Sequence, residues 1–147
     1  MALIGLVKPG SWIQLMEGDF SGQLAKNTPA LEAWYALLRE LQMHSGVGHE
    51  FWRELRGWFE EVGLVSVKNK VFDIPLGARN PKVEMGIKGT RTVMGTTESI
   101  LEGLKRQAHL PVSHEKVAAL ITQLEQEVPK RGGLYRVYTI WGRRPPN

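Results

Sequence analysis

Two carboxylates near the end of a short apolar segment are the first candidates for chemistry. Glu17 and Asp19 follow residues 11–16, a mostly apolar segment that is predicted to be a strand. Ligands of open α/β sheets bind beyond the carboxyl ends of strands, so this position favours a functional site. A carboxyl group with a raised pKa can act there as an acid or a base. We predict that Glu17 is catalytic and that Asp19 contacts substrate. For Asp19, a solvated loop or a helix cap is the stronger alternative.

Two histidines flank the glycine turn Ser45-Gly46-Val47-Gly48 further along the chain. His44 and His49 are separated by five positions across this turn, which lacks the rigid ligand spacing of a zinc motif. We therefore expect no metal ion. The pattern suggests His44 as a catalytic hydrogen-bond donor or acid and His49 as a substrate contact. An ordinary surface position is the alternative for each.

Two aromatic side chains stand apart from the apolar stripes of their predicted helices. Tyr35 lies off the stripe of residues 30–43, and Trp52 lies off the stripe of residues 50–62. Amphipathic aromatic residues are common in the walls of pockets and interfaces. We predict that both bind substrate.

Periodicity predicts the elements that must position these residues. Helices are expected after a Thr28-Pro29 start, over residues 50–62 up to Gly63, and over residues 82–109 in two pieces separated by glycines. A last helix is expected from Ser113, closed by Pro129 and Gly132-Gly133. Strands are expected at Ser11–Met16, at Leu64–Ile74 with Pro75 as the terminator, and at Leu134–Trp141. The last strand is apolar on both faces, so it should be central and covered on both sides.

Composition narrows the class of protein. A chain of 147 residues that is 42% hydrophobic can form one domain with its own core, over residues 1–147. It contains no cysteine and no run of about 18 apolar residues, and residues 1–7 make a poor signal peptide. The net charge of +4 includes no block of five basic residues, which argues against nucleic-acid binding. We expect a cytoplasmic protein without nucleic-acid or membrane partners.

Four motifs follow one another along the chain: Val7-Lys8-Pro9-Gly10-Ser11-Trp12, then Phe59-Glu60-Glu61-Val62-Gly63-Leu64-Val65, then Asn80-Pro81, then Gly133-Leu134-Tyr135 through Trp141-Gly142-Arg143. Together they resemble the C-terminal half of LaeA-like fungal methyltransferases of secondary metabolism, which use S-adenosylmethionine. The first two motifs are general to Rossmann methyltransferases, and the last two are more specific to the fungal group. The resemblance extends from about Ala2 to Pro145.

The resemblance implies an α/β fold, the truncated C-terminal half of a Rossmann-like methyltransferase. It implies a small three-stranded mixed sheet, in the order first-last-second, packed with four to five helices. The family's cofactor-binding glycine loop has no counterpart, and Gly46-Val47-Gly48 follows a predicted helix instead of a strand. We therefore expect that the chain holds no cofactor. The segment Gly89–Gly95 matches the part of the family that closes over substrate, which suggests Arg91 as catalytic and Met94 as substrate-binding. An irregular surface helix is the alternative.

Three functions agree with this resemblance. The first is a cofactor-independent cyclase of the pericyclase or Diels–Alderase type, an isomerase or lyase that folds a hydrophobic polyketide or terpenoid intermediate. Proximity alone can lower a barrier by ~7–11 kcal/mol. The second is a non-catalytic interaction module. The third is a methyltransferase fragment that works with a partner chain.

The resemblance also bears on assembly. In the family that the chain resembles, the strand that corresponds to Trp12–Met16 pairs on its other side with strand four. Strand four has no counterpart here, so Trp12–Met16 would be an exposed edge, and exposed apolar edges promote association. We expect a homodimer that covers this edge or the open faces of the sheet. The alternative is a monomer in which the apolar N-terminus and residues 82–109 fold back over the gap.

Overall fold

The computed structural model describes residues 2–21, 27–48, 50–106 and 109–146. The chain divides into two compact units. The first contains residues 1–19, 50–72 and 136–147, and the second contains residues 20–49 and 73–135. In the described part of the chain, no helix is long and apolar enough to span a membrane.

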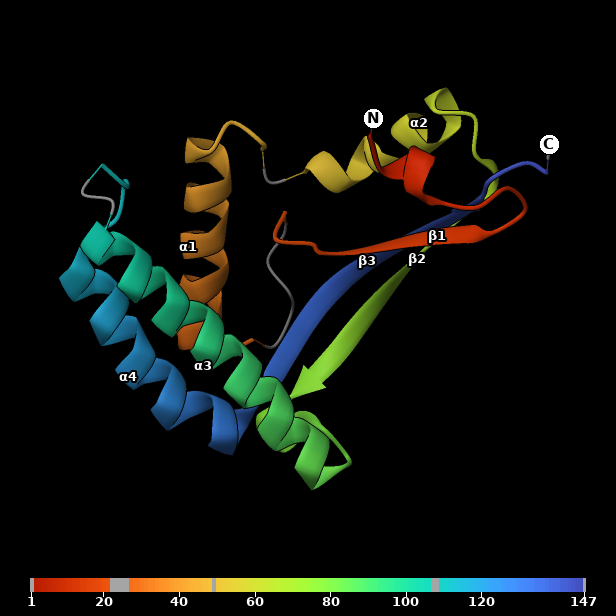
Figure 1. Ribbon diagram of the computed structural model, residues 1–147. Coiled ribbons are helices and arrows are strands. Elements are labelled where there is room, and N and C mark those ends of the chain that lie inside the picture. The colour runs from red at the N-terminus through yellow and green to blue at the C-terminus, as the bar shows by residue number, and fades with distance from the viewer. Residues whose placement is uncertain (1, 22–26, 49, 107–108, 147) are drawn as a thin grey trace. The chain divides into compact units, whose positions relative to one another are not determined.

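The three strands form one sheet in the order β1-β3-β2, where β1 is Trp12–Gly18, β2 is Val65–Leu76 and β3 is Gly133–Arg143 (Figure 1). Strand β3 is central and runs antiparallel to β1, with Trp12 opposite Arg143 and Gly18 opposite Val137. The predicted α/β class and the predicted strand order are confirmed. The sheet was expected to be mixed, but it is antiparallel throughout.

Short 3-10 helices and longer α-helices connect the strands. They are the 3-10 helices η1 (Ala2–Leu6), η2 (Phe51–Arg53) and η3 (Gly77–Arg79), and the α-helices α1 (Pro29–His44), α2 (Leu55–Glu61), α3 (Val83–Arg106) and α4 (His114–Arg131). The predicted starts of α1 and α4 are confirmed. The side chain of Thr28 accepts a hydrogen bond from the Leu31 N–H, and the side chain of Ser113 accepts one from the Lys116 N–H.

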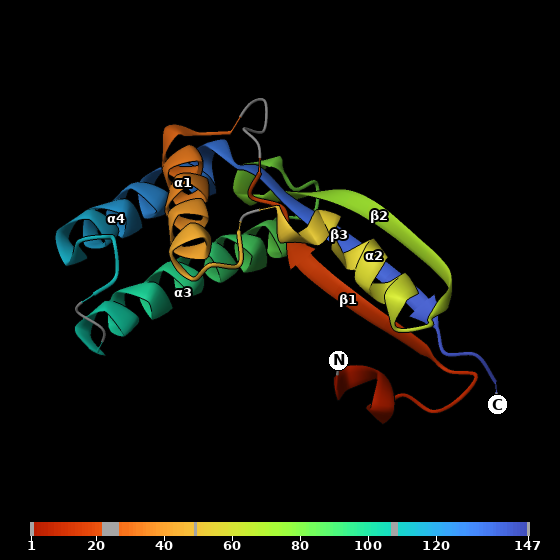
Figure 2. The same ribbon diagram turned by 90° about the horizontal axis from the view of Figure 1, so that it is seen from above.

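In the first unit, α2 lies along one face of the sheet (Figure 2). Leu55 and Phe59 of α2 are buried there together with Tyr138 and Ile140 of β3. Alternate residues of β1, among them Leu15, pack partly against the same cluster. The burial of this face fixes the register of the strands, because a shift by one residue would expose every apolar side chain on it.

In the second unit, α3 and α4 run side by side, and α1 packs on α4 (Figure 1). The core between them contains the buried residues Leu31, Leu76, Val93, Val117, Leu124 and Val128. An aromatic cluster completes it, in which Phe20, Trp34, Tyr35 and Tyr135 meet with ring centroids 5.5–6.1 Å apart, most of them edge to face. The aromatic residues of α1, Trp34 and Tyr35, therefore belong to this core.

Two helix predictions were wrong. The helix expected over residues 50–62 is split into η2 and α2, and the region expected to break at its glycines is the single helix α3. A Cβ at Gly86 would overlap the carbonyl of Gly77, and a Cβ at Gly89 would lie 2.7 Å from the Leu76 side chain. These glycines serve close packing against α3 and do not interrupt it.

Both proline stops were also wrong. Pro75 lies inside β2, which continues to Leu76, and an edge strand tolerates proline because its outer N–H groups need no strand partner. Pro129 lies inside α4, which ends at Gly132 with φ +64°. The predicted stop at Gly132 is therefore confirmed, whereas Pro129 does not terminate the helix.

Candidate functional site

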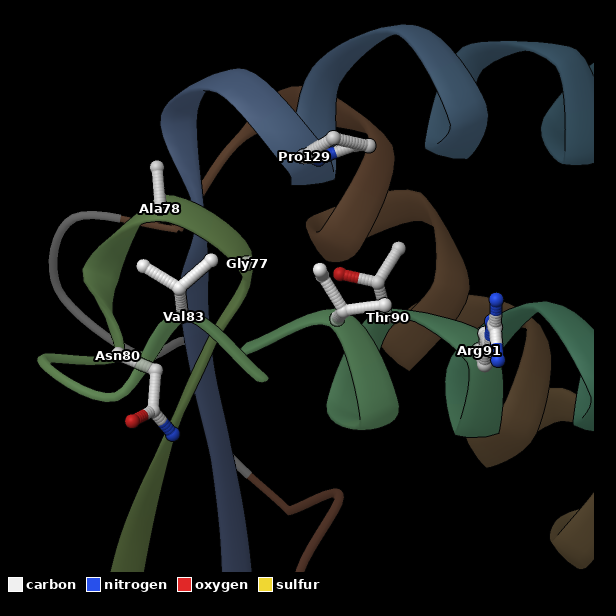
Figure 3. Close-up of a pocket in the computed structure, with 8 residues that line it drawn as sticks. Gly77, Ala78, Asn80, Val83, Thr90, Arg91 and Pro129 are labelled. Atoms are coloured by element: carbon white, nitrogen blue, oxygen red, sulfur yellow. The ribbon is translucent and has the colours of Figure 1, made fainter. Parts of the chain in front are cut away.

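The second unit contains a hollow of about 310 Å³ between η3, α3 and the last turn of α4 (Figure 3). The residues that line it are Gly77, Ala78, Asn80, Val83, Ile87, Thr90, Arg91 and Pro129. Val83 is 75% exposed and Ile87 is 50% exposed, so both of these large apolar side chains are accessible where they line the hollow. The walls of the hollow are therefore apolar and accessible.

Close backbone packing makes one side of the hollow rigid. Gly77 has φ +53°, and a Cβ there would overlap the carbonyl of Val128. A Cβ at Gly132 would lie 2.5 Å from the backbone nitrogen of Arg79. Glycine is required at these positions, because only its backbone can approach the neighbouring segments so closely.

The polar side chains that line the hollow form hydrogen bonds with other residues of the chain, with the exception of Arg91. The side-chain nitrogen of Asn80 donates to the Pro75 carbonyl at 2.9 Å, and its oxygen accepts from the Lys82 N–H at 3.0 Å. The Thr90 hydroxyl donates to the Gly86 carbonyl at 3.0 Å. The exposed guanidinium of Arg91 has no hydrogen bond or ion pair with any other described residue. This hollow therefore suits an apolar molecule that carries one anionic or carbonyl group.

The other predicted residues of the second unit lie elsewhere. Tyr35 is 1% exposed, and its hydroxyl donates to the Leu134 carbonyl at 3.3 Å, so it is a core residue and the expectation that it lies off the buried face was wrong. Met94 packs partly against the same core. His44 is exposed at the end of α1, with its ring centroid 6.2 Å from that of His109. His49 lies outside the described residues.

In the first unit, the predicted residues meet at Tyr138. Glu17 is opposite Tyr138 in the pairing of β1 with β3, and the Trp52 ring is 4.9 Å from the Tyr138 ring. The buried Nε1–H of Trp52 has no hydrogen-bond partner among the described residues. Burial raises the pKa of the Tyr138 hydroxyl, and the positive charge of Arg56 opposes this to a lesser extent.

Asp19 follows β1 and is buried. Its backbone N–H donates to the Arg136 carbonyl at 3.0 Å, which extends the pairing with β3 by one residue. The solvated-loop alternative for this residue is therefore wrong. The predicted end of the strand at Met16 was also too early, because Glu17 and Gly18 belong to β1.

The structure brings together Glu17, Trp52 and Tyr138 in one unit, and Arg91 with the hollow in the other. Sequence reasoning missed Tyr138, Val83, Ile87 and Pro129. The available signal for Tyr138 was its position on the same face as Ile140 in a two-sided strand. No such signal existed for the hollow, because η3, α3 and α4 approach each other only through tertiary packing. Within the described ranges, no three metal-binding side chains cluster.

The sequence of the chain is similar to those of several fungal proteins. No family model matches the chain. The chain is 30% identical to N-methyltransferase gliN of Aspergillus fumigatus, 30% identical to N-methyltransferase sirN of Leptosphaeria maculans and 26% identical to N-methyltransferase verN of Clonostachys rogersoniana. Each match covers 97% of this chain but only 52%, 51% and 48% of the respective relative. The chain is thus similar along nearly its whole length to fungal N-methyltransferases and spans about half the length of these relatives.

The turn at Gly46 and Gly48 and the N-terminus of α1 do not fit the methyl donor that this similarity implies. A donor with a carboxylate and a ribose would use a glycine turn between a strand and a helix N-terminus. Gly46 and Gly48 have φ values of +77° and +79°, but they follow α1. The N-terminus of α1 is already capped, because the Glu127 carboxylate accepts from the Ala30 N–H at 3.1 Å and Thr28 Oγ1 accepts from the Leu31 N–H at 3.3 Å.

Proposed function

We propose that this chain is the small-molecule-binding half of a methyltransferase-like protein and that an apolar molecule occupies the hollow beside α3. In this proposal the chain belongs with the LaeA-like enzymes of secondary metabolism, because it carries the four motifs that resemble theirs. Its main support is that a chain similar to N-methyltransferases over 97% of its length has an apolar hollow with a single uncommitted guanidinium. Small-molecule sites commonly have this composition.

In this proposal the residues of the chain bind and orient the substrate. Val83, Ile87 and Pro129 exclude water from its apolar part, and Arg91 holds its polar group. The methyl donor supplies the methyl group, and a second stretch of polypeptide, in the same or another chain, holds it.

Binding of an apolar anion tests the hollow directly. The probe is 8-anilinonaphthalene-1-sulfonate, whose fluorescence rises when it leaves water. Ile87→Ser and Arg91→Gln should each weaken its binding about tenfold, because each removes one of the two recognition elements. Met85→Ser is the matched control, since Met85 and Ile87 are both 50% exposed on α3 but only Ile87 lines the hollow. Equal affinities for all four proteins would overturn the placement.

Methyl transfer tests the activity. The chain is mixed with the half of gliN that the similarity leaves unmatched, and labelled S-adenosylmethionine is supplied with a panel of apolar secondary amines and amides. The label should appear in a small molecule only when both polypeptides are present, and Ile87→Ser should reduce the yield. Absence of labelled product from a folded complex would contradict the proposed activity.

A cofactor-independent cyclisation is the second candidate. It is favoured by the apolar hollow, since a cyclisation needs a shape-selective cavity, and by the N-terminus of α1, which is already capped and does not hold a donor. In this case the chain alone should convert a linear polyene precursor to a cyclic isomer, without a cofactor or metal, and Arg91→Gln should slow the conversion. Conversion that requires the gliN half would exclude it.

A further inference from the structure

The two faces of the sheet in the first unit differ in cover. One face is buried against α2, whereas the other, which we call the open face, carries Trp12, Gln14 and Met16 of β1, Thr139 and Trp141 of β3, and Phe72 of β2. Pairing of Gln14 with Trp141 and of Met16 with Thr139 places these side chains on the same side. The open face is accessible, since Trp12 is 54%, Met16 63% and Phe72 42% exposed.

The open face is shaped like a binding surface. A groove of about 390 Å³ runs between Trp12, Gln14, Phe72, Thr139 and Trp141. Contiguous exposed apolar patches of this kind mark interaction sites on soluble proteins. The buried Oγ1 atom of Thr139 beside the groove has no hydrogen-bond partner among the described residues. A buried hydroxyl without a partner is costly, so a group that arrives in the groove gains a hydrogen bond there.

The edge of the sheet beside the open face is also uncovered. Strand β1 pairs with β3 on one side, and no strand in the described part of the chain pairs with its other side. An edge strand with unpaired N–H and C=O groups accepts another strand readily. Groove and edge together therefore present apolar and hydrogen-bonding contacts to one occupant.

We infer that the open face and the β1 edge are the docking surface for the other half of a methyltransferase, a polypeptide about as long as this chain. The length of the relatives supports this occupant, because gliN, sirN and verN each continue for about the same length again beyond the matched part. This inference rests on the proposed function, since it names the surface where the donor-holding half attaches. A second copy of this chain is the competing occupant.

The test measures the affinity of the chain for the unmatched half of gliN. Trp12→Asp and Met16→Asp each place a charge on the open face and should weaken binding at least tenfold. Met85→Asp is the control, because Met85 is 50% exposed on α3 and lines neither the hollow nor the groove of the open face. Circular dichroism checks that each polypeptide is folded. If the gliN half folds only together with the chain, the yield of co-purified complex for each variant replaces the affinity.

The outcomes separate this inference from the proposed function. Weakened docking by Trp12→Asp and Met16→Asp, with sulfonate binding in the hollow unchanged, supports the docking surface. Equal affinities for all variants, or no complex while sulfonate binding is intact, overturns the docking surface and leaves the hollow standing. Docking without methyl transfer overturns only the proposed function. A homodimer that Met16→Asp dissolves, and that the gliN half does not displace, assigns the surface to a second copy and overturns the inference.

Discussion

The two faces of the sheet in the first unit are built from alternate residues of the same strands, yet they have opposite roles. The face towards α2 carries Leu15 and Ile140, which pack against Leu55 and Phe59. The face on the other side carries Trp12 and Met16, which remain largely exposed. Because both faces are apolar, hydrophobicity alone does not decide which is buried. The presence of a covering element decides it, and the chain supplies that element for one face.

Truncation of a core residue on the covered face should have the largest effect. Ile140 is fully buried, so Ile140→Ala should lower the free energy of unfolding by about 2–5 kcal/mol through lost burial and a residual cavity. Met16→Thr on the open face keeps a strand-forming residue and should change it by about 0.5 kcal/mol or less. Urea denaturation of the two variants measures both. Similar losses would mean that the open face is covered within the chain.

Crowding on the covered face should give the next largest effect. A Cβ at Gly142 would lie 3.2 Å from both Leu64 and Phe59, so Gly142→Ala should cost about 1–3 kcal/mol. Gly95 of α3 has open space around it, and Gly95→Ala should stabilise the chain by about 0.5–1 kcal/mol. Thermal unfolding compares the pair. An unchanged midpoint for Gly142→Ala would show that α2 is loosely held.

The unpartnered hydroxyl beside the groove predicts a gain. Thr139→Val removes a buried oxygen that has no partner among the described residues, and it should stabilise the isolated chain by about 1 kcal/mol. The same variant should bind the gliN half less tightly than the wild type, because the arriving group loses its hydrogen bond. A loss of stability in the isolated chain would show that Thr139 is already satisfied.

The smallest effect concerns pH on the covered face. Burial raises the pKa of Tyr138 above 10.0, so the folded state keeps the phenolic proton where the unfolded chain releases it. Stability from this group is present below pH 10 and is lost as the pH rises through the raised value. Tyr138→Phe should therefore flatten the alkaline decline of the urea midpoint. An identical decline in both proteins would place Tyr138 in contact with water.

Much of the fold was predictable from sequence. The two apolar faces of residues 134–141 correctly placed β3 in the centre of the sheet, and Thr28 and Ser113 correctly marked helix starts. These features depend on neighbours in sequence or on a simple alternation. The predictions failed where the role of a residue depends on its tertiary partners, as for Pro75, Pro129 and the glycines of α3. Pro75 is tolerated because β2 is an edge strand, and Gly86 and Gly89 allow close packing against α3.

The site was less predictable than the fold. Arg91 was selected from sequence and does line the hollow, whereas Tyr35 was selected for leaving its stripe and is a core residue. Helix periodicity shows which residues share a face but not how many faces are covered. Tyr35 lies on a second covered face of α1, which packs against both Phe20 and Leu134. The catalytic roles of Glu17, His44 and Arg91 stay predictions. The same holds for the substrate contacts of Asp19, His49, Trp52 and Met94.

The most direct test of the open face uses the absence of native cysteine. Met16→Cys, at a position that is 63% exposed, and Val83→Cys, at one that is 75% exposed, are each alkylated with iodoacetamide. The rates are measured by peptide mass spectrometry for two proteins. One is the chain alone, and the other is a fusion in which the chain replaces the matched half of gliN. If the open face is the docking surface, joining should slow alkylation of Met16→Cys at least tenfold and leave the rate for Val83→Cys unchanged. Equal rates at Met16→Cys in the two proteins, with both folded, would contradict it.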